Sequence, residues 1–114
     1  MFGRQKTNDV TPDEAAGLHE QGAVLLDVRE DDEWAAGHAP GAVHVPLGQV
    51  SEAAARFDGQ RVLAVCRGGN RSAQAAEILV AAGVEVSNVA GGMSAWAASG
   101  LPVVRDDGAP GAVA

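Results

Sequence analysis

The chain has one cysteine, Cys66, which follows the short valine-rich run 62–65 and begins a glycine-containing loop. The alanine-rich stretch 72–82 after this loop predicts a helix, so the thiol stands between a predicted strand and a predicted helix. A lone cysteine is often only a small apolar core residue. At the carboxyl end of a strand in an open parallel sheet, however, a side chain faces the crevice where ligands bind. We therefore interpret Cys66 as a nucleophile.

The loop after Cys66 supplies groups that stabilise a negatively charged sulfur. Gly68 and Gly69 allow the backbone to curl with its amide hydrogens pointing inward, which makes a nest for an anion. The start of the predicted helix and the guanidinium groups of Arg67 and Arg71 add positive charge. We expect these groups to lower the pKa of the thiol, because each favours the thiolate. The predicted site comprises Cys66, Arg67, Gly68, Gly69, Asn70, Arg71 and Ser72.

This loop resembles the active-site loop of the rhodanese family of sulfurtransferases. Other segments resemble further signatures of that family in the same order along the chain: Asp-Val-Arg-Glu at 27–30, Glu-Trp at 33–34, Gly-His-Ala-Pro-Gly-Ala at 37–42, Pro-Leu at 46–47 and Gly-Gly-Met-Ser-Ala-Trp at 91–96. The resemblance covers about residues 9–102, which is nearly the whole chain.

The resemblance implies an α/β fold, with a five-stranded parallel sheet in the spatial order 1-5-4-2-3 and helices on both faces. It also implies that a sulfane sulfur moves from a donor such as thiosulfate, through a persulfide on Cys66, to a thiophilic acceptor. That acceptor is cyanide in an assay and a thiol or protein in the cell. We expect Arg67 and Arg71 to hold the sulfonate of the donor, and we expect no cofactor.

Two other functions fit parts of the pattern. A rhodanese-like module that docks a protein, or that accepts sulfur from a persulfide-donating protein, would use the same fold, and the presence of Cys66 favours the sulfur relay over pure docking. Cysteine-dependent phosphatases also use a thiolate, a cradle of amides and an arginine at the end of the loop. Their loops place five residues between cysteine and arginine, whereas four residues separate Cys66 from Arg71.

Asp27 and Arg29 stand at the carboxyl end of the predicted strand 23–28, on the same side of a parallel sheet as Cys66. Ion pairs in such positions usually support the loops around a site, and we favour this supporting role over contact with substrate. The three histidines, His19, His38 and His44, are interpreted as structural. Without a second cysteine or an acidic cluster at ligand spacing, they predict no metal site.

The composition limits the cellular context of the protein. A net charge of −7 argues against binding to nucleic acid or to anionic membranes. The sequence shows no signal-peptide pattern and no apolar run long enough to span a bilayer, and a lone thiol stays reduced in the cytoplasm. We therefore expect a cytoplasmic protein with one domain over residues 1–104 and a disordered, glycine-rich tail over 105–114.

Periodicity and turn signals predict strands that alternate with helices, which is typical of a parallel sheet covered on both faces. Thr11, Pro12 and Glu14 form a capping-box signature for the first helix, which we expect to end at the left-handed residue Gly22. The paired glycines 91–92 are expected to bring the start of the last helix close to the Cys66 loop. Helices are predicted at 11–21, 30–36, 47–57, 72–82 and 92–99, strands at 23–28, 42–45, 61–65 and 84–89, and a frayed arm with a short edge strand near its end at 1–8.

Overall fold

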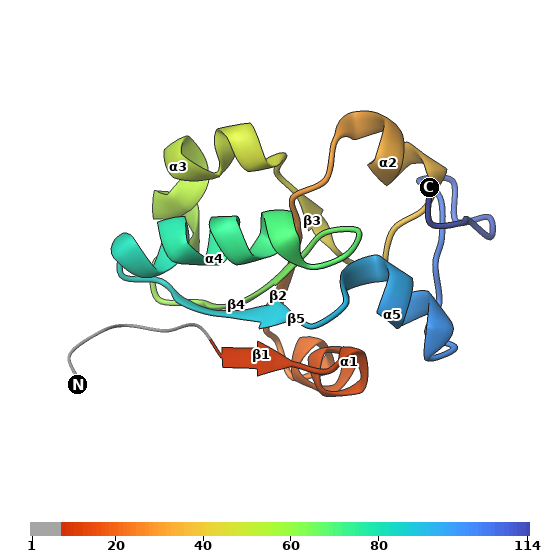
Figure 1. Cartoon of the computed structure of the whole chain (residues 1–114), viewed down its shortest axis with the longest axis horizontal. Helices are drawn as coiled ribbons and strands as arrows, with labels where there is room; N and C mark the ends of the chain where they lie inside the picture. The colour runs from red at the N-terminus through yellow and green to blue at the C-terminus, as the bar shows by residue number, and fades with distance from the viewer. Residues whose placement is uncertain (1–7) are drawn as a thin grey trace.

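A computed structural model describes residues 8–114. It contains one parallel sheet with the strand order β1-β5-β4-β2-β3, which confirms the predicted α/β architecture (Figure 1). The arm predicted for residues 1–8 lies outside the described residues, apart from Asn8 in the first strand. The strands are β1 (Asn8–Val10), β2 (Val24–Asp27), β3 (Val43–His44), β4 (Arg61–Val65) and β5 (Glu85–Val89).

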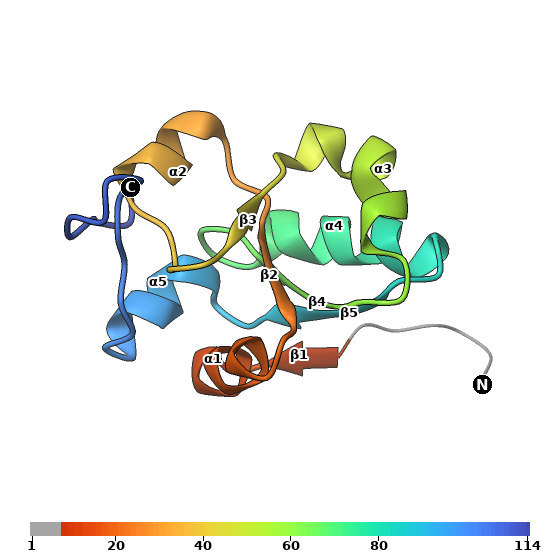
Figure 2. The ribbon, with the colours of Figure 1, turned by 180° about the vertical axis from the view of Figure 1, so that it is seen from behind.

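Helices cover both faces of the sheet, with α3 and α4 on one face and α1 and α5 on the other (Figures 1 and 2). The single helix predicted over 47–57 is divided into a short α-helix between two 3-10 turns, η1 (Leu47–Gln49) and η2 (Ala54–Phe57). None of the helices within residues 8–114 is long and apolar enough to cross a membrane. The α-helices are α1 (Pro12–Glu20), α2 (Asp31–Ala36), α3 (Val50–Ala53), α4 (Asn70–Ala81) and α5 (Gly92–Ala98).

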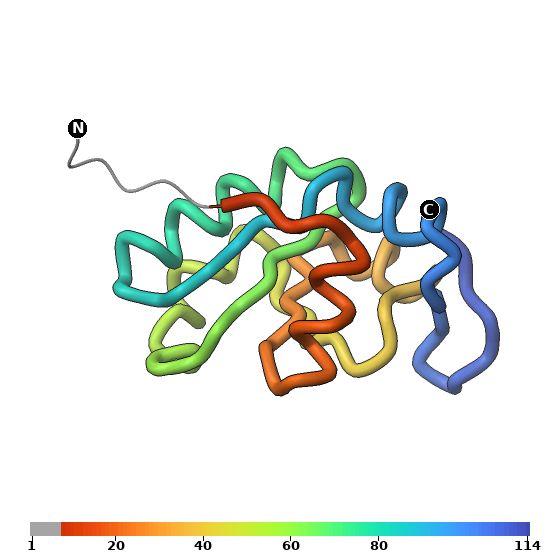
Figure 3. The backbone as a smooth tube through the Cα atoms, turned by 90° about the horizontal axis from the view of Figure 1, so that it is seen from below, coloured from red at the N-terminus to blue at the C-terminus, as the bar shows by residue number. Residues whose placement is uncertain are grey.

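The first helix begins as its sequence predicts. The Glu14 amide donates to the Thr11 hydroxyl at 3.1 Å, and the Glu14 carboxylate accepts from the Thr11 amide at 2.8 Å, so the capping box is closed. The backbone after the helix reverses at Gly22, whose φ of +111° lies in the region that favours glycine. Figure 3 shows the sheet from the side covered by α1.

Alternation along the central strand β4 assigns its side chains to two separate cores. Val62 and Ala64 pack with α3 and α4, whereas Leu63 and Val65 pack with α1 and α5. The residue that follows the strand, Cys66, continues this period of two and belongs to the core under α3 and α4. The sheet therefore presents the thiol toward α4, at the carboxyl end of the central strand.

Residues 105–114 differ from the disordered tail that their composition predicts. Val104 bridges His38 and Pro110, and the Ala112 amide donates to the Ala36 carbonyl at 3.0 Å, so the segment lies beside α2 (Figures 1 and 2). A Cβ atom on Gly111 would lie 2.8 Å from the Cα atom of residue 37, and the absence of side chains permits this approach. Gly111 here permits close packing, which composition alone could not distinguish from disorder.

Candidate active site

The sulfur of Cys66 lies inside the curve of its own loop. The backbone amide of Gly69 donates to Sγ at 3.0 Å, and the Ser72 hydroxyl lies 3.2 Å from Sγ. Gly69 adopts a φ of +112° at the start of α4, a conformation that turns its amide inward and that residues with a side chain rarely adopt. Cys66 is 1% exposed, yet its sulfur has hydrogen-bond donors beside it and not only aliphatic neighbours.

Two opposing effects set the acidity of this thiol. Burial raises the pKa of Cys66, whereas hydrogen bonds from the Ser72 hydroxyl and from the backbone amides of Ser72, Gly69 and Gly68 lower it. The hydrogen bonds prevail, and the pKa of Cys66 lies below the ordinary value of a cysteine. The thiolate is the reactive form of a cysteine, so the geometry of the loop favours a nucleophile.

The start of α5 holds the loop from its other side. The Met93 amide donates to the Cys66 carbonyl at 2.7 Å, and the Ser94 amide donates to the Arg67 carbonyl at 3.0 Å. Gly92 has a φ of +58°, and a Cβ atom there would collide with the Cys66 carbonyl and lie 2.6 Å from that of Arg67. The close approach expected from the paired glycines 91–92 is therefore present.

We expect Gly92→Ala to lower the free energy of unfolding by more than about 2 kcal/mol, since left-handed strain adds to a backbone collision. Chemical denaturation followed by circular dichroism measures this loss. Gly83→Ala is the matched control, because Gly83 has a φ of +87° with open space around it, and it should lose only about 1 kcal/mol. Equal losses of unfolding free energy in the two variants would show that the close contact between α5 and the loop does not contribute to stability.

Arg71 is bound by an acidic residue, Glu33, that is part of the family resemblance but was not predicted as a site residue. Its two terminal nitrogens donate to the Glu33 carboxylate at 2.6 and 2.8 Å, which links α4 to α2. The hydrogen bonds from Arg71 hold the pKa of Glu33 at about 2, and Glu33 in turn raises the pKa of Arg71. The nearby Cys66 sulfur also favours the charged guanidinium. Glu33 thus fixes a cation close to Cys66.

This ion pair predicts a pH dependence of stability. The pKa of Glu33 falls from 4.5 to about 2 on folding, so its contribution is complete above pH 4.5 and disappears as the pH falls toward 2. We expect the unfolding free energies of the wild type and Glu33→Gln to approach each other by about 1–2 kcal/mol between pH 6 and pH 3. Urea denaturation at each pH provides the measurement, and a constant difference between the two proteins would contradict the assignment.

The remaining loop residues are exposed, and one of them, Arg67, is hydrogen-bonded to another part of the chain. Arg67, Gly68 and Asn70 are exposed, and the Arg67 Nε donates to the Ala114 carbonyl oxygen at 2.7 Å. Both loop arginines therefore donate hydrogen bonds within this chain: Arg71 to a carboxylate and Arg67 to a main-chain oxygen. The sulfonate contact expected for these arginines remains a prediction.

Asp27 and Arg29 form a fully buried ion pair, with 2.8 Å between Arg29 Nη2 and Asp27 Oδ2. The same nitrogen donates to the Gly37 carbonyl at 2.7 Å and so anchors the chain that leads to β3. Leu25, two residues before Asp27, packs with α1 and α5, on the face opposite to the core that contains Cys66. This placement fits the supporting role favoured from the sequence, since the pair stabilises the strand end without facing the sulfur.

The histidines make structural contacts. The rings of His38 and His44 stack on the Trp34 indole with centroid distances of 3.5 and 4.7 Å. One ring nitrogen of each donates to a backbone carbonyl, that of Trp34 and that of Arg29 respectively, and a ring nitrogen of His19 donates to the Ala23 carbonyl. Within residues 8–114, no three His, Cys, Asp or Glu side chains cluster as metal ligands.

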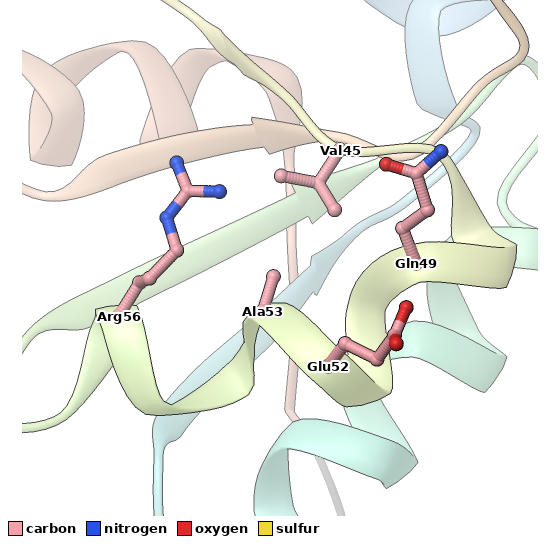
Figure 4. A pocket seen from close by; sticks show the side chains of 5 residues that line it. All are labelled: Val45, Gln49, Glu52, Ala53 and Arg56. Carbon is pink, nitrogen blue, oxygen red and sulfur yellow. The ribbon is translucent and has the colours of Figure 1, made fainter.

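A surface hollow lies away from the thiol loop, between the chain that follows β3 and the helical segment around α3. Figure 4 shows its lining, which contains no residue of the Cys66 loop: Val45, Gln49, Glu52, Ala53 and Arg56. The hollow is therefore separate from the candidate active site.

Comparison with known proteins places the whole arrangement in a family. The family model of the Rhodanese-like domain matches residues 11–99. A thiosulfate sulfurtransferase, GlpE, from Pseudomonas savastanoi pv. phaseolicola is 38% identical over 92 residues, which cover 79% of this chain and 87% of that protein. A crystal structure of a rhodanese-related protein from Thermoplasma volcanium aligns with a TM-score of 0.79 at 28% identity, covering 85% of this chain and 97% of the other.

A further relative shows that such a domain also occurs within a longer protein. An HTH-type transcriptional regulator from Mycobacterium tuberculosis is 39% identical over 105 residues, which cover 89% of this chain but 46% of the regulator. The chain thus spans about half the length of that relative. The family model, the sulfurtransferase relative and the five-stranded parallel fold agree, and the chain belongs to the rhodanese-like domain family.

Proposed function

We propose that this protein transfers sulfane sulfur from thiosulfate, or from a similar small anionic donor, through a persulfide on Cys66 to a thiophilic acceptor. One observation carries the proposal: Sγ lies 3.0 Å from the Gly69 amide and 3.2 Å from the Ser72 hydroxyl, in a loop that favours the thiolate. The family membership supports sulfur transfer as the type of reaction. A thiol nucleophile of this kind stays reduced in the cytoplasm, which is the compartment we propose.

The first half of the reaction loads the enzyme. The Cys66 thiolate attacks the outer sulfur of thiosulfate, a bond forms between Sγ and that sulfur, and the bond to the sulfonate sulfur breaks. The electron pair of the broken bond leaves with sulfite. The cysteine persulfide then carries one negative charge on its terminal sulfur. Amides of the loop that face the sulfur are placed to stabilise this charge, as the donors of an oxyanion hole stabilise an oxyanion.

The second half returns the thiolate. Cyanide attacks the terminal sulfur, the bond between the two sulfurs breaks with its electron pair remaining on Sγ, and thiocyanate leaves. A cellular thiol or a protein thiolate takes the place of cyanide in the cell. Because Cys66 is 1% exposed, a donor or acceptor with a narrow reacting end fits the site best. We propose that Arg71, held by Glu33, supplies the positive charge that favours the anionic donor.

A sulfur relay between proteins is the second candidate. Both terminal nitrogens of Arg71 bind the Glu33 carboxylate, and Arg67 Nε donates to the main-chain oxygen of Ala114, so donors of both guanidinium groups are already engaged and are not free to bind a sulfonate. A persulfide of a partner protein carries no sulfonate and would need no such contact. This arrangement of the arginines is the observation that favours the relay.

A phosphatase is disfavoured by the same loop. Four residues separate Cys66 from Arg71, and both terminal nitrogens of Arg71 bind Glu33 instead of turning into the loop toward a phosphate. A persulfide needs space for only one added sulfur atom. The smaller ring therefore fits sulfur chemistry better than phosphate chemistry.

Three substrates tested in parallel distinguish these functions. The proposed activity predicts thiocyanate formation from thiosulfate and cyanide. Sulfur transfer from a persulfide-loaded cysteine desulfurase, with no thiocyanate from thiosulfate, would assign the relay. Hydrolysis of p-nitrophenyl phosphate with neither sulfur reaction would overturn the sulfurtransferase proposal.

A further inference from the structure

The hydroxyl of Ser72 has more acceptors around it than it has protons. Its oxygen lies 2.5 Å from Asn88 Oδ1, 3.2 Å from Cys66 Sγ and 3.2 Å from the Gly69 carbonyl oxygen. Ser72 is fully buried and Asn88 is 6% exposed, so bulk water does not supply additional donors freely. A hydroxyl carries one proton and donates one strong hydrogen bond at a time. The sulfur and the amide oxygen of Asn88 therefore compete for the same proton.

The sheet fixes which end of the Asn88 amide faces Ser72. Asp9 of β1 is the cross-strand partner of Asn88 in β5, and its carboxylate oxygen lies 3.4 Å from Asn88 Nδ2. An ionised carboxylate only accepts hydrogen bonds, so it favours the amide nitrogen on its own side. The oxygen of the amide is thereby directed toward Ser72, as an acceptor and not as a donor.

The two protonation states of Cys66 require different arrangements of this network. With the neutral thiol, the S–H group can donate to the Ser72 oxygen, and the Ser72 hydroxyl donates to Asn88 Oδ1. With the thiolate, the Ser72 hydroxyl must turn to the sulfur, and a buried acceptor on Asn88 loses its donor. A buried polar atom without a partner costs free energy. The interaction between Ser72 and Asn88 therefore belongs to the neutral state.

We infer that Asn88 is a positioning residue that opposes ionisation of Cys66 by drawing the Ser72 proton away from the sulfur. Its role is indirect, since it acts on the nucleophile through Ser72. The charged groups around the nucleophile come from three other elements: Arg71 at the start of α4, which is paired with Glu33 of α2, and Asp9 of β1 behind the amide. Asn88 itself carries no charge, so it acts on Cys66 through hydrogen bonding alone.

Under the proposed function, the same network has a use during turnover. When the persulfide forms, the negative charge moves from Sγ to the terminal sulfur, and Sγ no longer needs the Ser72 proton. The hydroxyl can then return to Asn88, which satisfies the buried amide in the loaded enzyme. This consequence rests on the proposed function, whereas the competition for the proton concerns the unloaded thiol alone.

The test is the pH dependence of Cys66 alkylation by iodoacetamide, which needs no sulfur donor and is unambiguous because the chain has one cysteine. Asn88→Leu removes the acceptor at similar volume, and we expect about a 3- to 10-fold larger ionisation constant of the thiol, that is, a lower pKa. Ser72→Ala removes the donor and should raise the pKa. In the double variant the effect of Asn88→Leu should vanish, because there is no proton left to compete for.

A purely structural role of Asn88 predicts the opposite sign, since loosening Ser72 would weaken its hydrogen bond to the sulfur and raise the pKa. A higher pKa in Asn88→Leu, or a lowering that persists in the Ser72→Ala background, would overturn the inference. If Asn88→Leu does not fold, Asp9→Ala at an exposed position tests the same network, because the released amide can turn its nitrogen to Ser72. Asp9→Ala should also lower the pKa of Cys66, and this lowering should disappear in the Ser72→Ala background. Sulfurtransferase activity enters none of these outcomes, so a failure here is distinct from a failure of the proposed function.

Discussion

Cys66→Ser is expected to reduce thiocyanate formation from thiosulfate to background, a loss of at least about a thousandfold, because a serine hydroxyl stays protonated and cannot carry the sulfur. The substitution replaces sulfur by oxygen at nearly constant volume. The Gly69 amide and the Ser72 hydroxyl can still contact the new oxygen. The fold should therefore persist, and thermal unfolding by circular dichroism is the control. Residual turnover above a few per cent in a folded variant would exclude a Cys66 persulfide as the intermediate.

Asp27→Ala is expected to lower the free energy of unfolding by about 3–5 kcal/mol, because it leaves the guanidinium of Arg29 buried without a counter-charge. Arg29 is fully buried, and among the described residues its Nη1 atom already has no hydrogen-bond partner. The carboxylate binds both the side chain and the backbone amide of Arg29, so one substitution removes several contacts. Urea denaturation of the purified variant measures the loss.

A double variant separates the buried charge from the lost packing. Asp27→Leu combined with Arg29→Met removes both charges at similar volume, and we expect it to recover a large part of the stability lost in Asp27→Ala. If the single variant loses less than about 1 kcal/mol, or the double variant is less stable than the single one, the pair is not the support of the strand end that its burial indicates.

The parts of the site built from local sequence could be predicted. The valine run before Cys66 forms the strand at the predicted residues 61–65, and the glycines after it allow an amide to turn toward the sulfur. The glycines at 91–92 allow the approach of α5, as expected. These features depend on backbone conformations and on the period of a strand, both of which neighbouring residues determine.

The hydrogen-bond partners of the polar side chains at the site could not be predicted in the same way, because they are distant in the sequence. Glu33 lies 38 positions from Arg71, and its run of acidic neighbours gives it the pattern of a solvated helix start. Asn88 lies 16 positions from Ser72, at a buried position of β5. A polar residue on the core face of a strand is a signal that sequence reasoning could have used. Its partner is known only once α4 is placed over the sheet.

Intact-mass spectrometry after incubation with thiosulfate tests the central claim most directly. A loop that stabilises sulfur anions predicts a gain of one sulfur atom, about 32 Da, which is removed by cyanide and absent in Cys66→Ser. The same gain in Cys66→Ser would place the sulfur elsewhere. An unchanged wild-type mass with thiosulfate and with a persulfide donor alike would contradict the account that Cys66 carries sulfur.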